Sequence, residues 1–192
     1  METSNTEKKI TICGTNNRYM IKKLTMDTAK KEHKKRVDSL SWNFSDEYFK
    51  YNKQIELLKD MFTNNFINAA DDADNAVRKI LFQQINTKIS GYKQQDMVKK
   101  HYDCQKFVDF NNIIVKLIEC ELKCRYCKEQ MTVLYDISRE MRQWSVDRID
   151  NDMGHNNDNY HLACLDCNLK RRRQTDKNFL FTKQLCIIKH GI

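Results

Sequence analysis

Apolar residues in the middle of the chain recur in steps of three and four, the spacing that places side chains on one face of an α-helix. The first stripe is formed by Tyr48, Tyr51, Ile55, Leu58 and Phe62. The second is formed by Val77, Ile80, Leu81 and Ile85, and the third by Phe107, Phe110, Ile114, Leu117 and Ile118. The pattern therefore predicts three helices with buried faces between about Asp46 and Leu122.

Residues that interrupt helices are scarce. The chain has no proline and only four glycines, so few positions favour a helix break. We expect Gly91-Tyr92 to end the second helix. Asp71, Asp72 and Asp74 suit the positive end of its dipole, so we interpret them as structural residues at its start.

Basic residues are concentrated at the two ends of the chain. In total, 34 Lys and Arg residues exceed 26 Asp and Glu residues, which gives a net charge of +8 at pH 7. Residues 1–36 and residues 164–192 each carry a clear basic excess. Such ends are attracted to phosphate backbones, but basic tails are also common as solvated segments. Both interpretations remain open.

The chain contains no long apolar run, and its first residues lack the apolar core of a secretion signal. We therefore expect an intracellular protein, in the nucleus or the cytoplasm, with no membrane partner. Its usage of Lys, Asn and Ile resembles that of proteins from AT-rich genomes, including large DNA viruses, and is compatible with a viral protein.

Four of the eight cysteines form two Cys-x-x-Cys pairs, Cys124 with Cys127 and Cys164 with Cys167. This spacing lets a turn aim both sulfurs at one ion, and Zn²⁺ favours four thiolates in a tetrahedron. We predict a structural zinc with no open position for water. The remaining cysteines are interpreted as buried apolar residues or surface thiols: Cys13, Cys104, Cys120 and Cys186.

A polar motif lies between and just after these pairs. It runs Trp144-Ser145-Val146-Asp147-Arg148-Ile149-Asp150, then Gly154-His155-Asn156, then Asn159-Tyr160-His161, and ends Cys167-Asn168-Leu169-Lys170-Arg171. Over about residues 120–175 this order resembles the HNH, or ββα-metal, nuclease family in an Asp-Arg-Ile-Asp variant. The resemblance implies a zinc-stabilised treble-clef module. Together with the helical stripes before it, this predicts an α+β fold, in which a mainly helical N-terminal region precedes the module.

The expected organisation has three parts: a basic N-terminal arm at residues 1–45, a helical domain at 46–119, and an HNH-like zinc module with a basic C-terminal helix at 120–192. The arm includes a short β-like stretch, Ile10–Cys13. The helical region offers a surface for protein partners.

The resemblance also implies roles for single residues. Asp147 and Asn168 would hold a catalytic Mg²⁺ or Mn²⁺, whose oxygen-rich shell leaves room for water and phosphate. Asn159 would brace the loop. Residues expected to contact the nucleic-acid backbone are Arg148, Lys170, Arg171, Arg172 and Arg173.

Arg148 departs from the family pattern, because active members carry a general-base histidine at this position. A guanidinium stays protonated at neutral pH and cannot act as a base. Loss of a positioned base costs about 10²–10⁴ in rate. His155 and His161 are nearby substitutes that titrate in a useful range, although each is equally well explained as a hydrogen-bonded or surface imidazole.

The favoured hypothesis is a metal-dependent HNH-type endonuclease that cleaves phosphodiester bonds, in DNA rather than RNA. The alternative is a catalytically impaired, zinc-dependent DNA-binding protein, viral or nuclear, and Arg148 is its best support. A third hypothesis is a zinc-containing scaffold for protein interactions.

Overall fold

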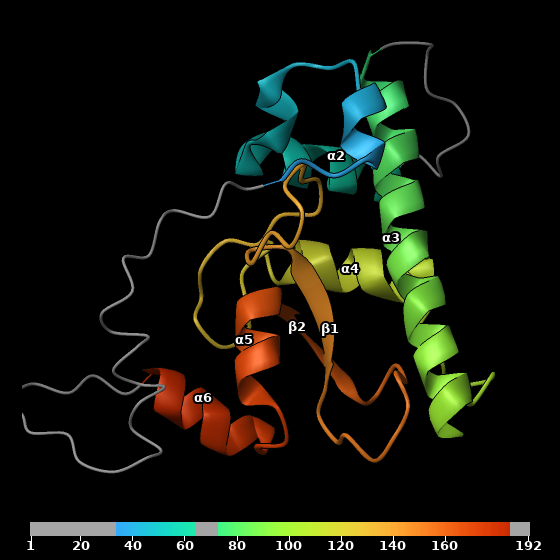
Figure 1. The fold of residues 1–192 in the computed structure, drawn as a ribbon, viewed down its shortest axis with the longest axis vertical. Helices are drawn as coiled ribbons and strands as arrows, with labels where there is room; N and C mark the ends of the chain where they lie inside the picture. The colour runs from blue at the N-terminus through green and yellow to red at the C-terminus, as the bar shows by residue number, and fades with distance from the viewer. Residues whose placement is uncertain (1–33, 64–72, 185–192) are drawn as a thin grey trace, which may run out of the picture. The chain divides into compact units, whose positions relative to one another are not determined.

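The structure is a computed structural model, and it describes residues 34–63 and 73–184 (Figure 1). Several sequence predictions fall outside these ranges. They are most of the basic arm with its β-like stretch Ile10–Cys13, the acidic residues Asp71 and Asp72, and the cysteines Cys13 and Cys186.

Two short 3-10 helices, η1 (Asp38–Ser41) and η2 (Asp46–Phe49), precede the helix α2 (Tyr51–Thr63). The buried face of α2 consists of Gln54, Leu57, Leu58 and Met61. The predicted first stripe was therefore partly wrong: Tyr48 lies in η2, before the helix begins, and Phe62 is exposed. The buried face of α2 is centred on Leu57 and Met61, and Phe62 lies outside it.

The helix α3 (Ala73–Lys99) is 27 residues long and buries Val77, Leu81, Ile85 and Ile89 along one side. The predicted end at Gly91-Tyr92 was wrong, because α3 continues through both residues. A glycine inside a helix costs only about 1 kcal/mol relative to alanine. Packing offsets that cost here: the hydroxyl of Tyr92 accepts a hydrogen bond from the Val146 amide, 3.1 Å away, and Asp96 is buried one turn later.

The helix α4 (Phe110–Glu119) begins at a capping box, in which Asp109 and Asn112 each accept a hydrogen bond from the other's backbone amide. Such reciprocal bonds satisfy amides that the first helical turn leaves free. The helix buries Ile113, Ile114 and Leu117. The third stripe predicted Ile114 and Leu117 but did not include Ile113. Phe107 lies before the helix and forms an isolated bridge with Asn156.

The strands β1 (Trp144–Arg148) and β2 (Tyr160–Cys164) form an antiparallel pair in which Asp147 lies opposite His161 and Trp144 opposite Cys164. The helix α5 (Leu165–Arg171) follows β2 without a linker and packs against both strands, and α6 (Asp176–Gln184) comes next (Figure 1). The described chain thus combines helices with a small two-stranded sheet, which confirms the predicted mixture of helix and strand.

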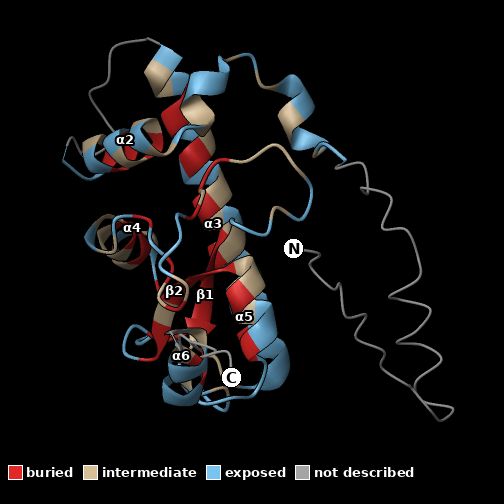
Figure 2. Cartoon of the chain, turned by 90° about the vertical axis from the view of Figure 1, so that its left-hand side faces the viewer, coloured by how far each residue is buried: buried red, intermediate tan, exposed pale blue. Residues whose placement is uncertain are grey.

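One hydrophobic cluster runs through the described residues, from Leu57 in α2 to Phe179 in α6 (Figure 2). Trp144, Tyr126 and Tyr160 are fully buried aromatic members of it. The helices α2, α3 and α4 therefore share their core with the segment that carries the cysteine pairs. No helix among the described residues is long and apolar enough to cross a membrane.

Gln54 is the one buried polar side chain of α2, and it holds the segment before β1. Its Oε1 accepts hydrogen bonds from the amides of Val133 and Leu134, at 2.8 and 3.0 Å. Its Nε2 donates to the carbonyl oxygens of Phe49 and Leu134. A single amide group thus satisfies four backbone groups.

We predict that Gln54→Leu lowers the free energy of unfolding by about 2–4 kcal/mol, because it leaves buried backbone groups without partners. Urea denaturation measures the change. Gln83→Leu, on the exposed side of α3, is the matched control and should change stability by less than about 0.5 kcal/mol. Equal effects of the two substitutions would contradict this interpretation.

Candidate functional site

Four cysteine sulfurs converge where the turn after α4 meets the end of the hairpin. Cys124 and Cys127 lie in that turn, Cys164 ends β2, and Cys167 lies in the first turn of α5. The four Sγ atoms all lie within 4.8 Å of one another. The Sγ atoms of Cys127 and Cys164 are 3.9 Å apart. Four sulfurs bound tetrahedrally to zinc, with Zn–S bonds of about 2.3 Å, lie about 3.8 Å from one another, so the observed distance is close to that of a zinc site. The group could hold a metal ion such as zinc.

The local backbone explains why the first pair can point inwards. Glu121, Leu122 and Lys128 adopt left-handed conformations, with φ of 49°, 49° and 62°. They fold the chain into a tight turn in which the Cys124 amide donates to the Glu129 carbonyl at 2.9 Å. The Cys164 amide points at the Cys124 sulfur, 3.3 Å away. Such an amide stabilises a thiolate.

The cysteines are tightly coupled by hydrogen bonding and burial. A hydrogen bond from the Cys164 thiol lowers the pKa of Cys124 to about 4. The same contact, together with burial, raises the pKa of Cys164. Metal binding must therefore release protons from the remaining thiols, so the affinity for zinc rises with pH.

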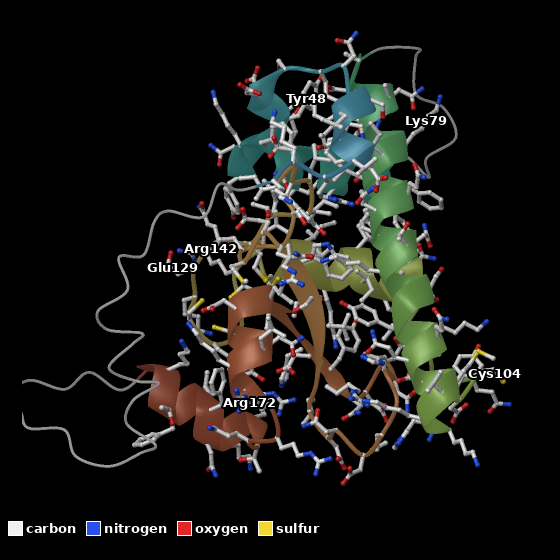
Figure 3. All side chains as sticks on the ribbon, in the orientation of Figure 1. Tyr48, Lys79, Cys104, Glu129, Arg142 and Arg172 are labelled. Atoms are coloured by element: carbon white, nitrogen blue, oxygen red, sulfur yellow. The ribbon has the colours of Figure 1, made fainter. Side chains whose placement is uncertain are left out.

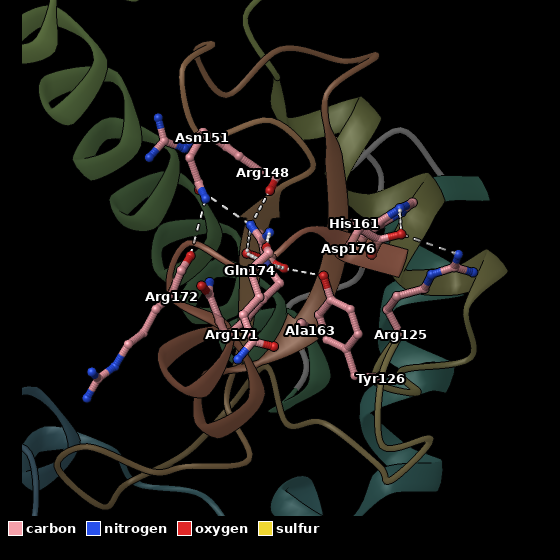
Figure 4. A network of polar contacts seen from close by, with 12 residues as sticks. Arg125, Tyr126, Arg148, Asn151, His161, Ala163, Arg171, Arg172, Gln174 and Asp176 are labelled. Atoms are coloured by element: carbon pink, nitrogen blue, oxygen red, sulfur yellow. Dashed lines mark hydrogen bonds and ion pairs between the residues drawn. The ribbon is translucent and has the colours of Figure 1, made fainter. Parts of the chain in front are cut away.

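Asp147, a residue of β1, is buried among polar side chains. Figure 4 shows the network of polar contacts around Arg171 and Tyr126. Oδ1 of Asp147 accepts hydrogen bonds from Nε of Arg171 at 3.0 Å and from Nη2 at 2.8 Å, and Nε also lies 2.7 Å from Oδ2. The Tyr126 hydroxyl donates to Oδ2. Burial raises the pKa of Asp147, and the contacts with Arg171 and Tyr126 oppose that rise. Protein donors therefore occupy both oxygens of this carboxylate.

Arg171 is only 1% exposed, so the expectation that it contacts a nucleic-acid backbone was wrong. The periodicity of α5 gives the reason: Cys167 and Arg171 are one turn apart and face the sheet, whereas Lys170 faces outwards. The Arg171 guanidinium also donates to the carbonyl oxygens of Gln174, at 2.6 Å, and Arg148. This side chain is an internal part of the fold.

Asn168 lies one turn before Arg171, and its Nδ2 donates to Ser145 Oγ at 3.0 Å and to the Val146 carbonyl at 3.1 Å. These bonds turn the amide towards β1. The expected ion between Asp147 and Asn168 would need a free carboxylate oxygen, but the Asp147 carboxylate is neutralised by Arg171. In this arrangement the two residues do not fit Mg²⁺ or Mn²⁺.

Asn159 braces the loop that joins β1 to β2. Its Nδ2 donates to the carbonyl oxygens of Asp150 and Gly154, at 2.9 and 3.0 Å. Its Oδ1 accepts from the Asp150 amide at 2.9 Å. One side chain thus closes the loop across its base, the position that the resemblance implied for it.

His155 is held by a buried carboxylate from α3. Asp96 is fully buried, and its two oxygens contact the His155 ring at Nδ1, 2.7 Å away, and the His155 backbone amide, 2.6 Å away. The ring stacks on Tyr92 with centroids 4.7 Å apart. Desolvation lowers the pKa of His155, and Asp96 acts in the opposite direction. Sequence reasoning missed Asp96, which lies in a polar stretch that carries no motif.

Gly154 makes this contact sterically feasible. A Cβ atom at this position would lie 2.4 Å from the backbone oxygen of His101 and 3.0 Å from Oδ2 of Asp96. The loop and the end of α3 approach so closely that only glycine fits without a shift of the backbone.

His155 lines a polar pocket of about 240 Å³ together with Tyr92, Arg148, Asn151 and Asn168. Nη1 of Arg148 donates to the Met153 carbonyl at 2.9 Å.

His161 lines a separate pocket of about 400 Å³ beside Lys116, Lys123, Arg125 and Lys128. Its Nε2 lies 3.6 Å from Asp176. The structure therefore places the two candidate histidines in different pockets, and only His155 shares one with Asn168.

The other basic residues of the motif lie on the surface, in the last turn of α5 and just after it. Lys170, Arg172 and Arg173 are exposed, and Nζ of Lys170 lies 2.7 Å from Asp166. Arg172 has a left-handed backbone with φ of 52° and ends α5. Figure 3 labels Arg172 at this end, away from Lys79 of α3.

Comparisons of the chain with models of protein families, with curated proteins and with solved structures give no match.

We predict that the purified protein retains one zinc ion, and that Cys167→Ser releases the zinc and unfolds the hairpin and α5. Structural zinc in small peptides contributes roughly 10–16 kcal/mol, comparable to the stability of a whole domain. Elemental analysis and circular dichroism measure the two effects. Cys104→Ser, at an exposed free thiol, is the control and should leave both unchanged.

Proposed function

We propose that this chain is a zinc-stabilised nucleic-acid-binding protein, with DNA as the favoured ligand, built on a treble-clef, HNH-type module that does not use a catalytic ion at Asp147. The observation that carries the proposal is the way in which charges are paired around β1, β2, α5 and α6.

The carboxylates of these four elements all have basic partners. Asp147 pairs with Arg171, Asp166 with Lys170, and Asp176 with His161 and with Arg125 at 3.9 Å. Among the described residues, no acidic partner lies against the guanidinium groups of Arg148, Arg172 or Arg173. A positive potential therefore remains at the end of α5. Unpaired guanidinium groups suit the phosphates of a nucleic acid.

The loop between the strands limits where a polyanion fits. Asp150, Asp152 and Asp158 are exposed on it, and they repel phosphate. A bound strand would therefore follow the side of α5 and the turn after it, away from the tip of the loop.

The order of elements supports the treble-clef interpretation. A turn with two cysteines, a β-hairpin, and a helix whose first turn carries the last cysteine follow one another around one cysteine cluster. Two arginines support binding rather than cleavage. Arg148 stands where the family has its base, and Arg171 neutralises the carboxylate expected to hold the ion.

We predict that the protein binds duplex DNA with a steep salt dependence, and that Arg173→Gln lowers the slope of log K against log salt by about 0.9, the effect of losing one phosphate contact. Fluorescence anisotropy across a salt series measures the slope. Lys79→Gln removes the same charge from the exposed side of α3 and should leave the slope unchanged. If neither variant differs from the wild type, the basic surface after α5 is not the binding site. No binding at moderate salt would favour the protein-interaction scaffold.

A second candidate function is endonuclease activity, and the contact between Asp96 and His155 favours it. A carboxylate beside Nδ1 holds the proton on that atom, which leaves Nε2 with its lone pair. Among the described residues, none forms a hydrogen bond with Nε2 of His155. In this candidate, Nε2 takes a proton from a water molecule as the water oxygen bonds to a phosphorus atom, the bond from that phosphorus to the 3′-oxygen breaks, and the leaving oxygen takes a proton from solvent. Arg148 stabilises the charge on the phosphate.

Asp96→Asn is the informative variant for this candidate. The His155 amide must still meet an oxygen, so the new NH₂ group faces Nδ1 and forces the ring proton onto Nε2. If the chain is a nuclease, nicking of plasmid DNA with Mg²⁺ or Mn²⁺ should fall by about 10²-fold or more. His161→Gln, in the other pocket, is the control. Absence of nicking by the wild-type protein would exclude the candidate.

A further inference from the structure

We propose that the guanidinium of Arg171 is a built-in cation: it takes the place beside Asp147 that a divalent ion would occupy, so that the polar site of this module needs neither Mg²⁺ nor Mn²⁺. The inference rests on the HNH-type interpretation of residues 120–175. It does not depend on nucleic-acid binding.

Arg171 contacts the carboxylate of Asp147 as a bound cation would contact its ligand. Nε and Nη2 of Arg171 reach the two oxygens of Asp147 at 2.7 and 2.8 Å, and both side chains are almost completely buried. Both nitrogens donate hydrogen bonds to Oδ1, and Nε also lies against Oδ2, so the guanidinium contacts the whole carboxylate. Its charge compensates the carboxylate inside the protein, as a metal ion would.

Both terminal nitrogens of Arg171 also have acceptors besides Asp147. Nη1 donates to the Gln174 carbonyl, Nη2 to the Arg148 carbonyl, and Nη2 also lies 3.4 Å from Oδ1 of Asn151 (Figure 4). These acceptors come from the end of β1, the loop after it and the turn after α5. The guanidinium is therefore fixed from several sides and cannot swing out without leaving three segments unsatisfied.

Displacement of the Arg171 guanidinium by a metal ion would be unfavourable for a second reason. An ion bound to Asp147 would leave the Arg171 charge buried without a carboxylate, and an unpaired buried charge is strongly destabilising. The Tyr126 hydroxyl also donates to the carboxylate, and it would have to turn away. Both oxygens of this carboxylate already accept hydrogen bonds from the protein, and these bonds compete with the oxygen coordination that a small divalent ion needs.

Mn²⁺ binding to the zinc-loaded protein tests the inference, with free Mn²⁺ measured by electron paramagnetic resonance. The wild-type protein and Arg172→Gln, which removes the neighbouring exposed charge, should show no Mn²⁺ site that depends on Asp147. Arg171→Gln frees the carboxylate and should raise the affinity for Mn²⁺ at least about tenfold. Adding Asp147→Asn to Arg171→Gln should remove that gain.

A measurement on the unaltered chain covers the case in which Arg171→Gln does not fold. The Nε–H resonance of Arg171 in ¹H–¹⁵N spectra reports the ion pair directly, and it should stay in place when Mg²⁺ is added. A shift of this resonance with Mg²⁺, or wild-type Mn²⁺ uptake that Asp147→Asn abolishes, would overturn the inference. No nucleic acid is present in either measurement, so their outcome is separate from that of the DNA-binding test.

Discussion

The convergence of four sulfurs within 4.8 Å is the constraint on which the C-terminal half of the structure depends. It joins the turn after α4 to the junction of β2 and α5, two segments separated by most of the polar motif. A two-stranded sheet is marginal in water without further support. The cysteine cluster and the packing of Trp144 and Tyr160 in the shared core together supply that support.

Several polar residues of the motif stabilise the fold around the cysteine cluster. Asp147 and Arg171 neutralise each other inside the protein, Asn159 closes the loop, and Asn168 fastens α5 to β1. A buried ion pair contributes little net stability compared with apolar residues of the same volume, but removal of one partner is costly. Such a pair fixes one arrangement of strand and helix, while the surface charge of the module is left to Arg148, Arg172 and Arg173.

Sequence patterns predicted the features that depend on local spacing. The stripes of α3 and α4 and the convergence of the four cysteines follow from short-range periodicity or pair spacing. Features that depend on tertiary contacts were missed or wrong. Gly91 was expected to end a helix that packing carries on to Lys99, and Arg171 was placed on the surface because spacing alone does not tell the buried face of a seven-residue helix from its exposed face. The partnership of Asp96 with His155 spans 59 residues, and no local pattern reports such a pair.

The contacts between α3 and the loop that joins the strands determine where the chain can be truncated. Asp96 meets both the ring and the backbone of His155, and Gly154 lies against the carbonyl of His101. A fragment cut at residue 119 would keep every cysteine of the cluster yet lose the carboxylate that orients the imidazole. The polar pocket of the cysteine-bearing segment is thus completed by Tyr92 and Asp96 of α3, and a fragment without that helix would lack part of the pocket wall.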